Sequence, residues 1–382
     1  MRFEEACEGY QAKRLTQDEA ASLLGVCSRT FRRYMHRYEE SGLEGLYDRR
    51  MHQLSNRCAP VDEVMALKDL YQTRYNGWNV RHFHRWYQDQ HQGQRSYSWV
   101  KNKLQDAGLV TKGDSPGPHR IKRLPSALPG MMVHQDGSTH EWVPGQYWDL
   151  IVTMDDATNE HYSMRFVEEE GTRSSLLGVK DVLEKHGIFC SFYSDRGSHY
   201  WHTPEAGGKV DKHNPTQFGN VLKQLGIEMI AAYSPQARGR SERAFATHQG
   251  RLPNELAIHG ITHIHAANDY LQQHYMPAFN REFKRPAREH GSAFVPLAGI
   301  NLDDYLCERY ERVVGKDNCV RFNNLSLQIP KDKHRYHYMK TKVTVLVHLD
   351  GLISILHGPR KLAQYQADGT LLNQQPGHAN AA

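Results

Sequence analysis

Apolar positions recur at helical spacing in the first part of the chain. Thr16 and Glu19 have the spacing of a capping box at the start of one helix, and Gly25 stands where that helix should end. A short turn leads to a second helix, which Ser28 is expected to cap. This order predicts a helix-turn-helix domain over residues 1–52 rather than a plain helical hairpin. Four arginines of its second helix are expected to contact DNA: Arg29, Arg32, Arg33 and Arg37.

The same period continues in three further segments, 61–75, 79–91 and 96–110. Three helices of this size indicate a second helix-turn-helix or winged DNA-binding domain over residues 53–112. Within it, Lys101 and Lys103 are expected to be exposed and to contact DNA, and His82 and His84 to face solvent or DNA. Residues 113–129 are rich in Pro and Gly and basic, which is typical of a linker.

From Gly130 the pattern changes to short apolar runs that predict strands. The runs 131–143, 146–154 and 161–168 have short connections and indicate an antiparallel meander. A helix over 172–186, a strand over 188–195, a helix over 216–226, a strand over 227–233 and a helix from about 240 follow. This is the order of an RNase H-like fold, in which the first and fourth strands lie side by side. The expected α/β catalytic core spans residues 130–290.

The C-terminal part again shows a different pattern. Residues 255–290 are expected to be helical and to complete the core. Alternating runs at 318–330, 340–351 and 352–358, with an Asp-Gly turn at 350–351, predict a small antiparallel barrel or sheet over residues 291–366. It would contact DNA or a second subunit, or only cover the core. Residues 367–382 have the composition of a disordered tail. The chain is therefore expected to be multidomain, with a helical N-terminus, an α/β core and a small β-barrel C-terminal domain.

Charge supports a nucleic-acid partner for the N-terminal part. Residues 1–124 hold 21 Lys and Arg against 15 Asp and Glu, whereas the remainder holds 27 against 28, so the net charge of +5 originates there. The six cysteines are scattered without a CxxC pair, which argues against a disulfide framework and a cysteine zinc site. No apolar run approaches the roughly 18 residues of a membrane span. We therefore expect a cytoplasmic protein that associates with nucleic acid.

Three carboxylates distant in sequence are expected to converge in the core. Asp136 lies on the first strand, Asp195 ends the fourth and Glu242 begins the helix that would cover those strand ends. Clustered carboxylates require cations, and hard oxygen ligands suit two Mg²⁺ or Mn²⁺ ions that act on a phosphodiester. Nearby cations are expected to face DNA phosphates: Arg238, Arg240, Arg243 and Arg251.

Other interpretations of these acidic residues stay open at this point. Asp136 could merely terminate a strand, and Asp195 before Arg-Gly could form a turn. Asp155 and Asp156, on the first turn of the meander, compete as metal ligands. His134 would share a face with Asp136 and either support it or simply be packed.

The segments "HQDGSTHEW", "YSDRGSHY", "TQFG" and "SPQARGRSER" resemble the motifs of bacterial insertion-sequence transposases of the ISNCY group, and Asp136, Asp195 and Glu242 resemble their DDE triad. The resemblance covers nearly the whole chain. It implies a polynucleotidyl transferase with a core similar to that of retroviral integrases, which uses Mg²⁺ for DNA cleavage and strand transfer. Ala246 and Gln249 stand where related enzymes often carry a basic residue, so Arg243 or Arg251 would have to replace it.

The resemblance also implies partners. The enzyme would bind the double-stranded ends of its own mobile element and target DNA, as a homo-oligomer that is at least a dimer on paired ends. A non-catalytic DNA-binding regulator that keeps the fold is the alternative, and a plain RNase H-like nuclease is less favoured because it would not need two DNA-binding domains. The presence of all three carboxylates favours the enzyme.

Overall fold

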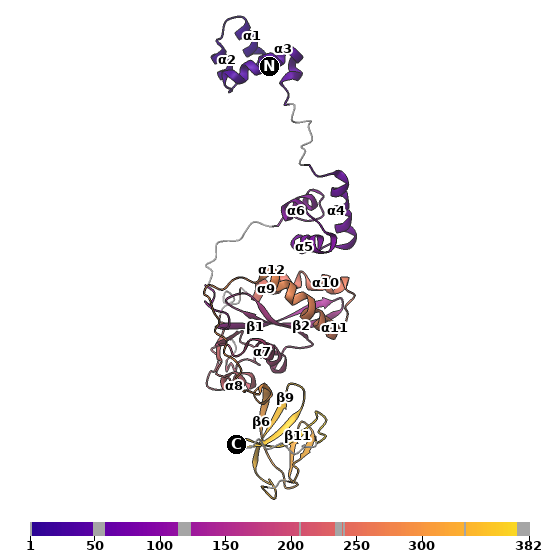
Figure 1. The fold of residues 1–382 in the computed structure, drawn as a ribbon, viewed down its shortest axis with the longest axis vertical. Helices are drawn as coiled ribbons and strands as arrows, with labels where there is room; N and C mark the ends of the chain where they lie inside the picture. The colour runs from indigo at the N-terminus through magenta and orange to yellow at the C-terminus, as the bar shows by residue number, and fades with distance from the viewer. Residues whose placement is uncertain are drawn as a thin grey trace. The chain divides into compact units, whose positions relative to one another are not determined.

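The computed structural model of the chain describes residues 2–48, 58–113, 124–205, 208–233, 239, 241–331 and 334–372. Its internal contacts divide it into two compact units. Figure 1 labels their helices and strands. The first unit comprises Met1–Asn76 and Ser98–Leu109, and the second Gly77–Tyr97 and Val110–Ala382. The finer domain boundaries expected from the sequence stay a prediction.

The first unit is helical and contains the expected helix-turn-helix. Thr16 and Glu19 form the predicted capping box, and Gly25 adopts a φ of 67° after α2, which a side chain would disfavour. Ser28 does not cap the next helix: Cys27 is the N-cap, and the Ser28 hydroxyl donates instead to Asp18. The elements are α1 (Arg2–Gln11), α2 (Gln17–Leu23), α3 (Ser28–Ser41), the 3₁₀ helix η1 (Gly42–Leu46), α4 (Val61–Arg74) and α6 (Tyr97–Asp106).

The helix α5 (Val80–His91) belongs to the second unit, although the sequence grouped it with α4 and α6. Asn79 caps it as expected, by accepting from the Arg81 amide at 2.8 Å. His82 is 1% exposed and lies 2.7 Å from Glu255 Oε1 on α10 (Leu252–Ile258), so the expectation of a solvent- or DNA-facing histidine was wrong. Burial lowers the pKa of His82, and a neutral imidazole suits this position.

A five-stranded sheet forms the centre of the second unit, in the order β3-β2-β1-β4-β5. The first three strands are antiparallel, and β4 and β5 run parallel to β1, which confirms the strand order expected for the core. The bounds are β1 (Met132–Val143), β2 (Gln146–Asp155), β3 (His161–Val167), β4 (Ser191–Ser194) and β5 (Glu228–Ala231).

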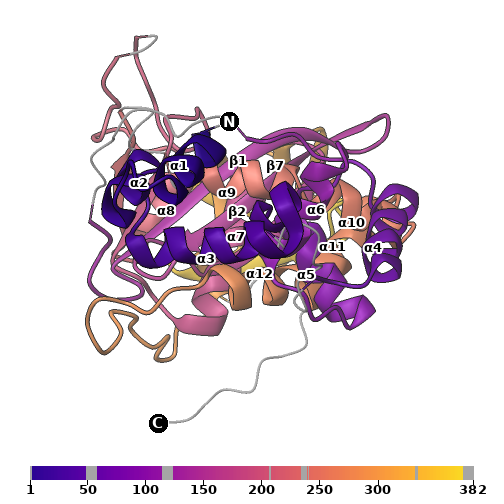
Figure 2. The ribbon, with the colours of Figure 1, turned by 90° about the horizontal axis from the view of Figure 1, so that it is seen from above.

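Both faces of this sheet are covered by helices, because the central strands carry apolar side chains on both sides. The helices α7 (Thr172–His186) and α8 (Gln217–Gln224) cover one face, with the bounds of α7 as predicted. The opposite face is covered by α9 (Ser241–Gln249), α10, α11 (Ile264–Tyr270), the π-helical segment η4 (Leu271–Tyr275) and α12 (Met276–Phe283). Seen from above, α9 overlies β1 and β2 (Figure 2).

The C-terminal strands form a four-stranded sheet, β11-β10-β9-β6, and a separate hairpin of β7 and β8. The predicted barrel is not confirmed, since the described strands close no barrel; β6 and β11 were not expected from the sequence. Asn323 and Asn324, both at positive φ, make the two-residue turn of the hairpin. The bounds are β6 (Cys307–Val313), β7 (Cys319–Phe322), β8 (Leu325–Gln328), β9 (Lys342–His348), β10 (Ile353–His357) and β11 (Arg360–Tyr365).

Two expectations about irregular segments also change. Residues 367–372 fold back on β11, with the Leu372 amide donating to Gln364 O at 2.8 Å, so the proposed tail is ordered at its start; 373–382 lie outside the described residues. In the linker, 114–123 lie outside them too, whereas Ser126 donates to Asp156 of the core. Among the helices that the structure describes, none is long and apolar enough to cross a membrane.

Candidate active site

Two neighbouring parallel strands place Asp136 and Asp195. The β1–β4 ladder pairs His134 with Tyr193; Asp136 lies two residues further along β1, and Asp195 lies two residues after Tyr193, directly beyond the end of β4. Adjacent strands are about 4.8 Å apart, so this register places the two residues close together at the end of β4. Asp136 is 8% exposed and Asp195 is half-buried. The topology therefore brings these two expected residues together.

Backbone amides orient both carboxylates. Asp136 Oδ1 accepts from the Gly137 amide at 3.1 Å, and Asp195 Oδ1 accepts from the Gly197 amide at 2.8 Å. The second bond is that of a turn-forming aspartate, so the structural interpretation of Asp195 is present alongside the chemical one.

Glu242 lies in the first turn of α9 and is exposed. Seven residues later, and thus on the same face of the helix, Gln249 Nε2 donates to Ser138 Oγ at 3.0 Å. Ser138 shares a strand face with Asp136. Leu252 of the following helix packs in the same cluster as Trp142, further along β1. Through Gln249, the last turn of α9 contacts β1 two residues beyond Asp136, and Glu242 begins the same helix.

The three carboxylates are nevertheless not gathered into a closed ligand set. Within the described ranges, no group of three or more His, Cys, Asp or Glu side chains is arranged to hold a metal ion. The donor chemistry fits a hard divalent cation, because all three candidates offer carboxylate oxygens. The geometry brings Asp136 and Asp195 together and leaves Glu242 exposed on α9.

Asp155 and Asp156, which competed as metal ligands, have structural roles. Both are 0% exposed. Asp155 accepts from the Gly130 amide at 3.0 Å and from Thr158, and burial raises the pKa of Asp155. Asp156 accepts from Ser126 and lies 2.9 Å from His134 Nε2, so His134 is packed against this carboxylate. The carboxylates of Asp155 and Asp156 therefore accept hydrogen bonds from protein groups around the β2–β3 connection, as buried polar groups usually do.

The sequence did not identify a buried polar group beside the two aspartates. The hydroxyl of Tyr200 donates to Gln135 Oε1 at 2.9 Å and lies 3.4 Å from Glu170 Oε1. Burial raises the pKa of Tyr200, and the charges of Glu170, Asp195 and Asp136 add to it, so the hydroxyl keeps its proton. The only signal in the sequence is that Tyr200 follows Asp195 within one motif.

The core arginines expected to face DNA differ from one another. Arg251 is 6% exposed, its guanidinium makes two bonds to Glu282 at 2.8 and 3.0 Å, and it lies over the Phe283 ring. That expectation was wrong, because a guanidinium held in a buried bidentate pair is not presented to a phosphate. Arg243 is exposed on α9 and bonds Gly239 O at 2.7 Å. Arg238 and Arg240 lie outside the described residues.

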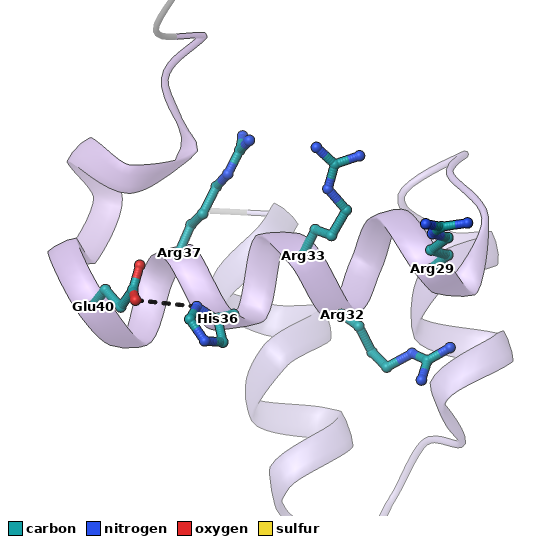
Figure 3. A pocket seen from close by; sticks show the side chains of 6 residues that line it. All are labelled: Arg29, Arg32, Arg33, His36, Arg37 and Glu40. Atoms are coloured by element: carbon teal, nitrogen blue, oxygen red, sulfur yellow. Dashed lines mark ion pairs between the residues drawn. The ribbon is translucent and has the colours of Figure 1, made fainter.

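A cationic groove of about 700 Å³ lies along α3 in the first unit (Figure 3). Arg33 and Arg37 point to one side and Arg32 to another, while Arg29 stands at the helix start. The single carboxylate in the lining, Glu40, pairs with His36 at 3.4 Å. Within the described part of the chain, no carboxylate pairs with these four arginines; Arg29, Arg32 and Arg33 are exposed, and Arg37 is half-buried. Lys101 and Lys103 on α6 are half-buried rather than fully exposed.

Comparisons with known proteins cover both units. Residues 8–64 match the family model described as winged helix-turn helix. A "Putative transposase y4bF" of Sinorhizobium fredii is 29% identical over 363 residues, covering 90% of this chain and 75% of that protein. The "Transposase for insertion sequence IS1202" of Streptococcus pneumoniae is 28% identical over 255 residues, covering 65% of this chain; the match spans about half of that protein, 54%.

Two viral structures share weak likeness with the chain. The simian T-cell lymphotropic virus intasome, in complex with PP2A regulatory subunit B56 gamma, is 12% identical with a TM-score of 0.34, over 68% of this chain and 84% of that one. The HTLV-2 integrase catalytic core domain in complex with magnesium, in its dimeric form, is 14% identical with a TM-score of 0.29, over 38% and 89%. By its sequence relatives and its N-terminal domain, the chain is similar to the transposases of bacterial insertion sequences.

Proposed function

We propose that this protein is a DDE transposase, which binds the ends of its own mobile element, cleaves DNA there and joins the freed end to target DNA. The observation that supports the proposal is the β1–β4 register, in which Asp136 on β1 and Asp195 just after β4 each follow a paired residue by two, while Glu242 begins α9, a helix that contacts β1. The transposase relatives support the same activity.

In this proposal Asp136, Asp195 and Glu242 are the catalytic carboxylates. Asp136 and Asp195, each oriented by a glycine amide, would hold the divalent cations at the end of β4, with Glu242 of α9 as the third ligand. Two Mg²⁺ or Mn²⁺ ions, when bound, would activate a water or a 3′-hydroxyl and neutralise charge on the leaving oxygen. Because the described residues contain no preformed set of three ligands, we expect cations and DNA to draw Glu242 toward the aspartates.

The exposed arginines of α3 would hold the element end. Their guanidiniums face solvent on one helix, as phosphate and base-edge contacts require. Joining two element ends to one target site requires two catalytic centres, so we propose that the active species is at least a dimer. On this account the protein acts at the bacterial nucleoid.

A nicking and joining assay tests the function. Full-length protein, labelled element-end duplex and Mg²⁺ should give nicked and then joined products. Asp136→Asn, Asp195→Asn and Glu242→Gln should each abolish both products and leave end binding intact, because each removes one ligand charge from the core and none from α3. Asp155→Asn would be a poor control, since its carboxylate is buried; Glu141→Gln on β1 is exposed and should retain activity. DNA binding without cleavage by the wild type would instead favour a non-catalytic regulator.

Assembly is tested by complementation. A mixture of Asp195→Asn protein with an Arg32→Ala, Arg33→Ala variant should regain joining, if one subunit grips the end that another cuts. Light scattering on paired-end DNA should give two or more subunits. One subunit per end, with no recovery in any mixture, would contradict the dimer.

A further inference from the structure

The carboxylate of Glu170 packs against the backbone of β1 directly after Asp136. Glu170 lies just before α7, and its amide donates to Asp149 Oδ2 of β2 at 2.7 Å. Its carboxylate rests on Gly137: a Cβ built there would come within 2.3 Å of Glu170 Oε2. Gly137 directly follows Asp136 on β1. The absence of a side chain at this strand position is therefore what admits the carboxylate.

The other oxygen of the same carboxylate faces the segment that follows Asp195. Glu170 Oε1 lies 3.4 Å from His199 Nε2 and 3.4 Å from the Tyr200 hydroxyl. Among the described residues, the buried Nε2 of His199 makes no hydrogen bond, and Glu170 is the carboxylate within ion-pair distance of it. Tyr200 is 1% exposed and also bonds Gln135 on β1. Glu170 thus spans the two segments that carry the aspartates.

The contacts of Glu170 with Gly137, His199 and Tyr200, called the Glu170 brace below, connect β1 to the segment after Asp195. This connection matters because the β1–β4 pairing ends before the two aspartates. The β1–β4 pairing ends at His134 and Tyr193, and β4 ends at Ser194, before Asp195. Main-chain ladder bonds therefore do not fix Asp195 relative to Asp136. We propose that Glu170 is a positioning residue, whose carboxylate holds the segment after Asp195 against β1 so that the two aspartates face one another. This inference rests on the proposed function, because it assigns Glu170 to the site that binds the cations.

The neighbouring glutamate provides a matched control. Glu168, Glu169 and Glu170 are consecutive, but Glu168 and Glu169 are exposed and only Glu170 is partly buried. Removing Glu169 changes the net charge equally and leaves the brace intact. Glu170→Gln keeps the volume and an acceptor oxygen for Tyr200, whereas Glu170→Ala removes every contact.

Mn²⁺ binding to the full-length protein, measured by calorimetry, reads out positioning without requiring turnover. Groups that orient metal ligands typically change metal affinity by about 10- to 100-fold. Glu170→Ala should weaken Mn²⁺ binding by about tenfold, Glu170→Gln by less, and Glu169→Ala should match the wild type. The thermal unfolding midpoint of each variant, taken without metal, shows that the fold is retained.

A second substitution tests the same contact from the other side. Gly137→Ala places a methyl where Glu170 Oε2 lies, and should displace the flexible carboxylate rather than the strand. It should therefore weaken Mn²⁺ binding by a factor similar to that of Glu170→Ala, and add little in the Glu170→Ala background.

The outcomes separate the inference from the function on which it rests. Wild-type affinity in Glu170→Ala, or additive losses in the double variant, would overturn the positioning role, provided that Asp136→Asn loses binding. If Asp136→Asn binds Mn²⁺ as the wild type does, the proposed metal site itself is wrong, and the role of Glu170 is refuted with it.

Discussion

The helix-turn-helix and the α/β core use charged side chains in opposite ways. On α3, four arginines line a groove and lack carboxylate partners among the described residues, and three of them, Arg29, Arg32 and Arg33, are exposed. In the core, Arg251 is 6% exposed and bound to Glu282, which also accepts from Arg85 at 2.8 Å. The first arrangement leaves positive charge available for a polyanion. In the second, the charged groups pair with each other and hold α5 and α12 together. An arginine-rich sequence therefore identifies a DNA contact only when the fold leaves the arginines exposed.

The largest effect should follow from breaking the buried ion pair. Arg251→Ala removes the bidentate partner of Glu282 and leaves it with Arg85 and the more distant Arg81, and the loss of one partner of a buried pair costs about 3–5 kcal/mol. Chemical denaturation of the full-length protein should show this loss of unfolding free energy. Arg243→Ala on the adjacent helix is the matched control and should cost well under about 1 kcal/mol, because Arg243 is exposed. Equal losses in both would contradict the contrast.

Acid should destabilise the core in a second way. His161 Nε2 lies 3.1 Å from His248 Nε2 of α9, and both rings are buried. Burial lowers the pKa of His161 to about 4 and that of His248 well below its usual range. The unfolded chain therefore binds more protons below pH 6.5, and stability that is present above pH 6.5 should be lost as the pH falls toward 4.

For His161 alone this amounts to about 3 kcal/mol at pH 4. Urea unfolding followed by tryptophan fluorescence at pH 7, 5.5 and 4.5 measures it, since Trp142 and Trp148 lie in the core cluster that contacts α9. His161→Asn should flatten the profile. A profile that is unchanged by that substitution would show that other groups control the acid sensitivity.

The exposed arginines should show the converse behaviour. Arg32→Ala with Arg33→Ala should weaken binding to element-end DNA and lower the slope of log affinity against log salt by about 2, because each phosphate contact contributes about 0.9. The unfolding free energy should stay within about 0.5 kcal/mol of the wild type. Salt titration by fluorescence anisotropy checks the slope. Loss of stability without a change of slope would mean that the groove is structural.

The smallest effect should come from α6. Lys101 and Lys103 are half-buried, so their ammonium groups reach a phosphate less freely than the α3 arginines do. Lys101→Ala with Lys103→Ala should lower the salt slope by less than about 1 in the same titration. A decrease in slope as large as that of the arginine pair would mean that α6 contacts as many phosphates as α3 does, and would contradict the prediction.

Regular elements could be predicted from the sequence because their signals are local. The capping box at Thr16, the Asn79 cap and the bounds 172–186 of α7 follow from spacing within one turn or one amphipathic face. The order of strands followed from connection lengths. The neighbourhood of Asp136 and Asp195 then followed from topology, without knowledge of any side-chain contact.

What depended on distant partners could not be predicted. The burial of His82 requires Glu255, which lies 173 residues later, and that of Arg251 requires Glu282. Glu170 reads in the sequence as one of three solvated glutamates, and only the close approach to Gly137 distinguishes it. Strand β6 (CERYERV) is largely charged and exposed toward its end, and β11 (RKLAQY) begins with two basic residues, so their apolar pattern is weak. The sequence could not separate an open sheet from a barrel.

The central claim is that Asp136, Asp195 and Glu242 form one divalent-metal site for DNA cleavage, and locating the metal tests it most directly. Crystals of the protein with element-end DNA and Mn²⁺ should give anomalous scattering peaks between Asp136 and Asp195, with Glu242 drawn in from α9. Asp195→Asn should remove at least one peak. Mn²⁺ bound elsewhere, or a DNA complex whose aspartates carry no metal while cleavage proceeds, would contradict the account.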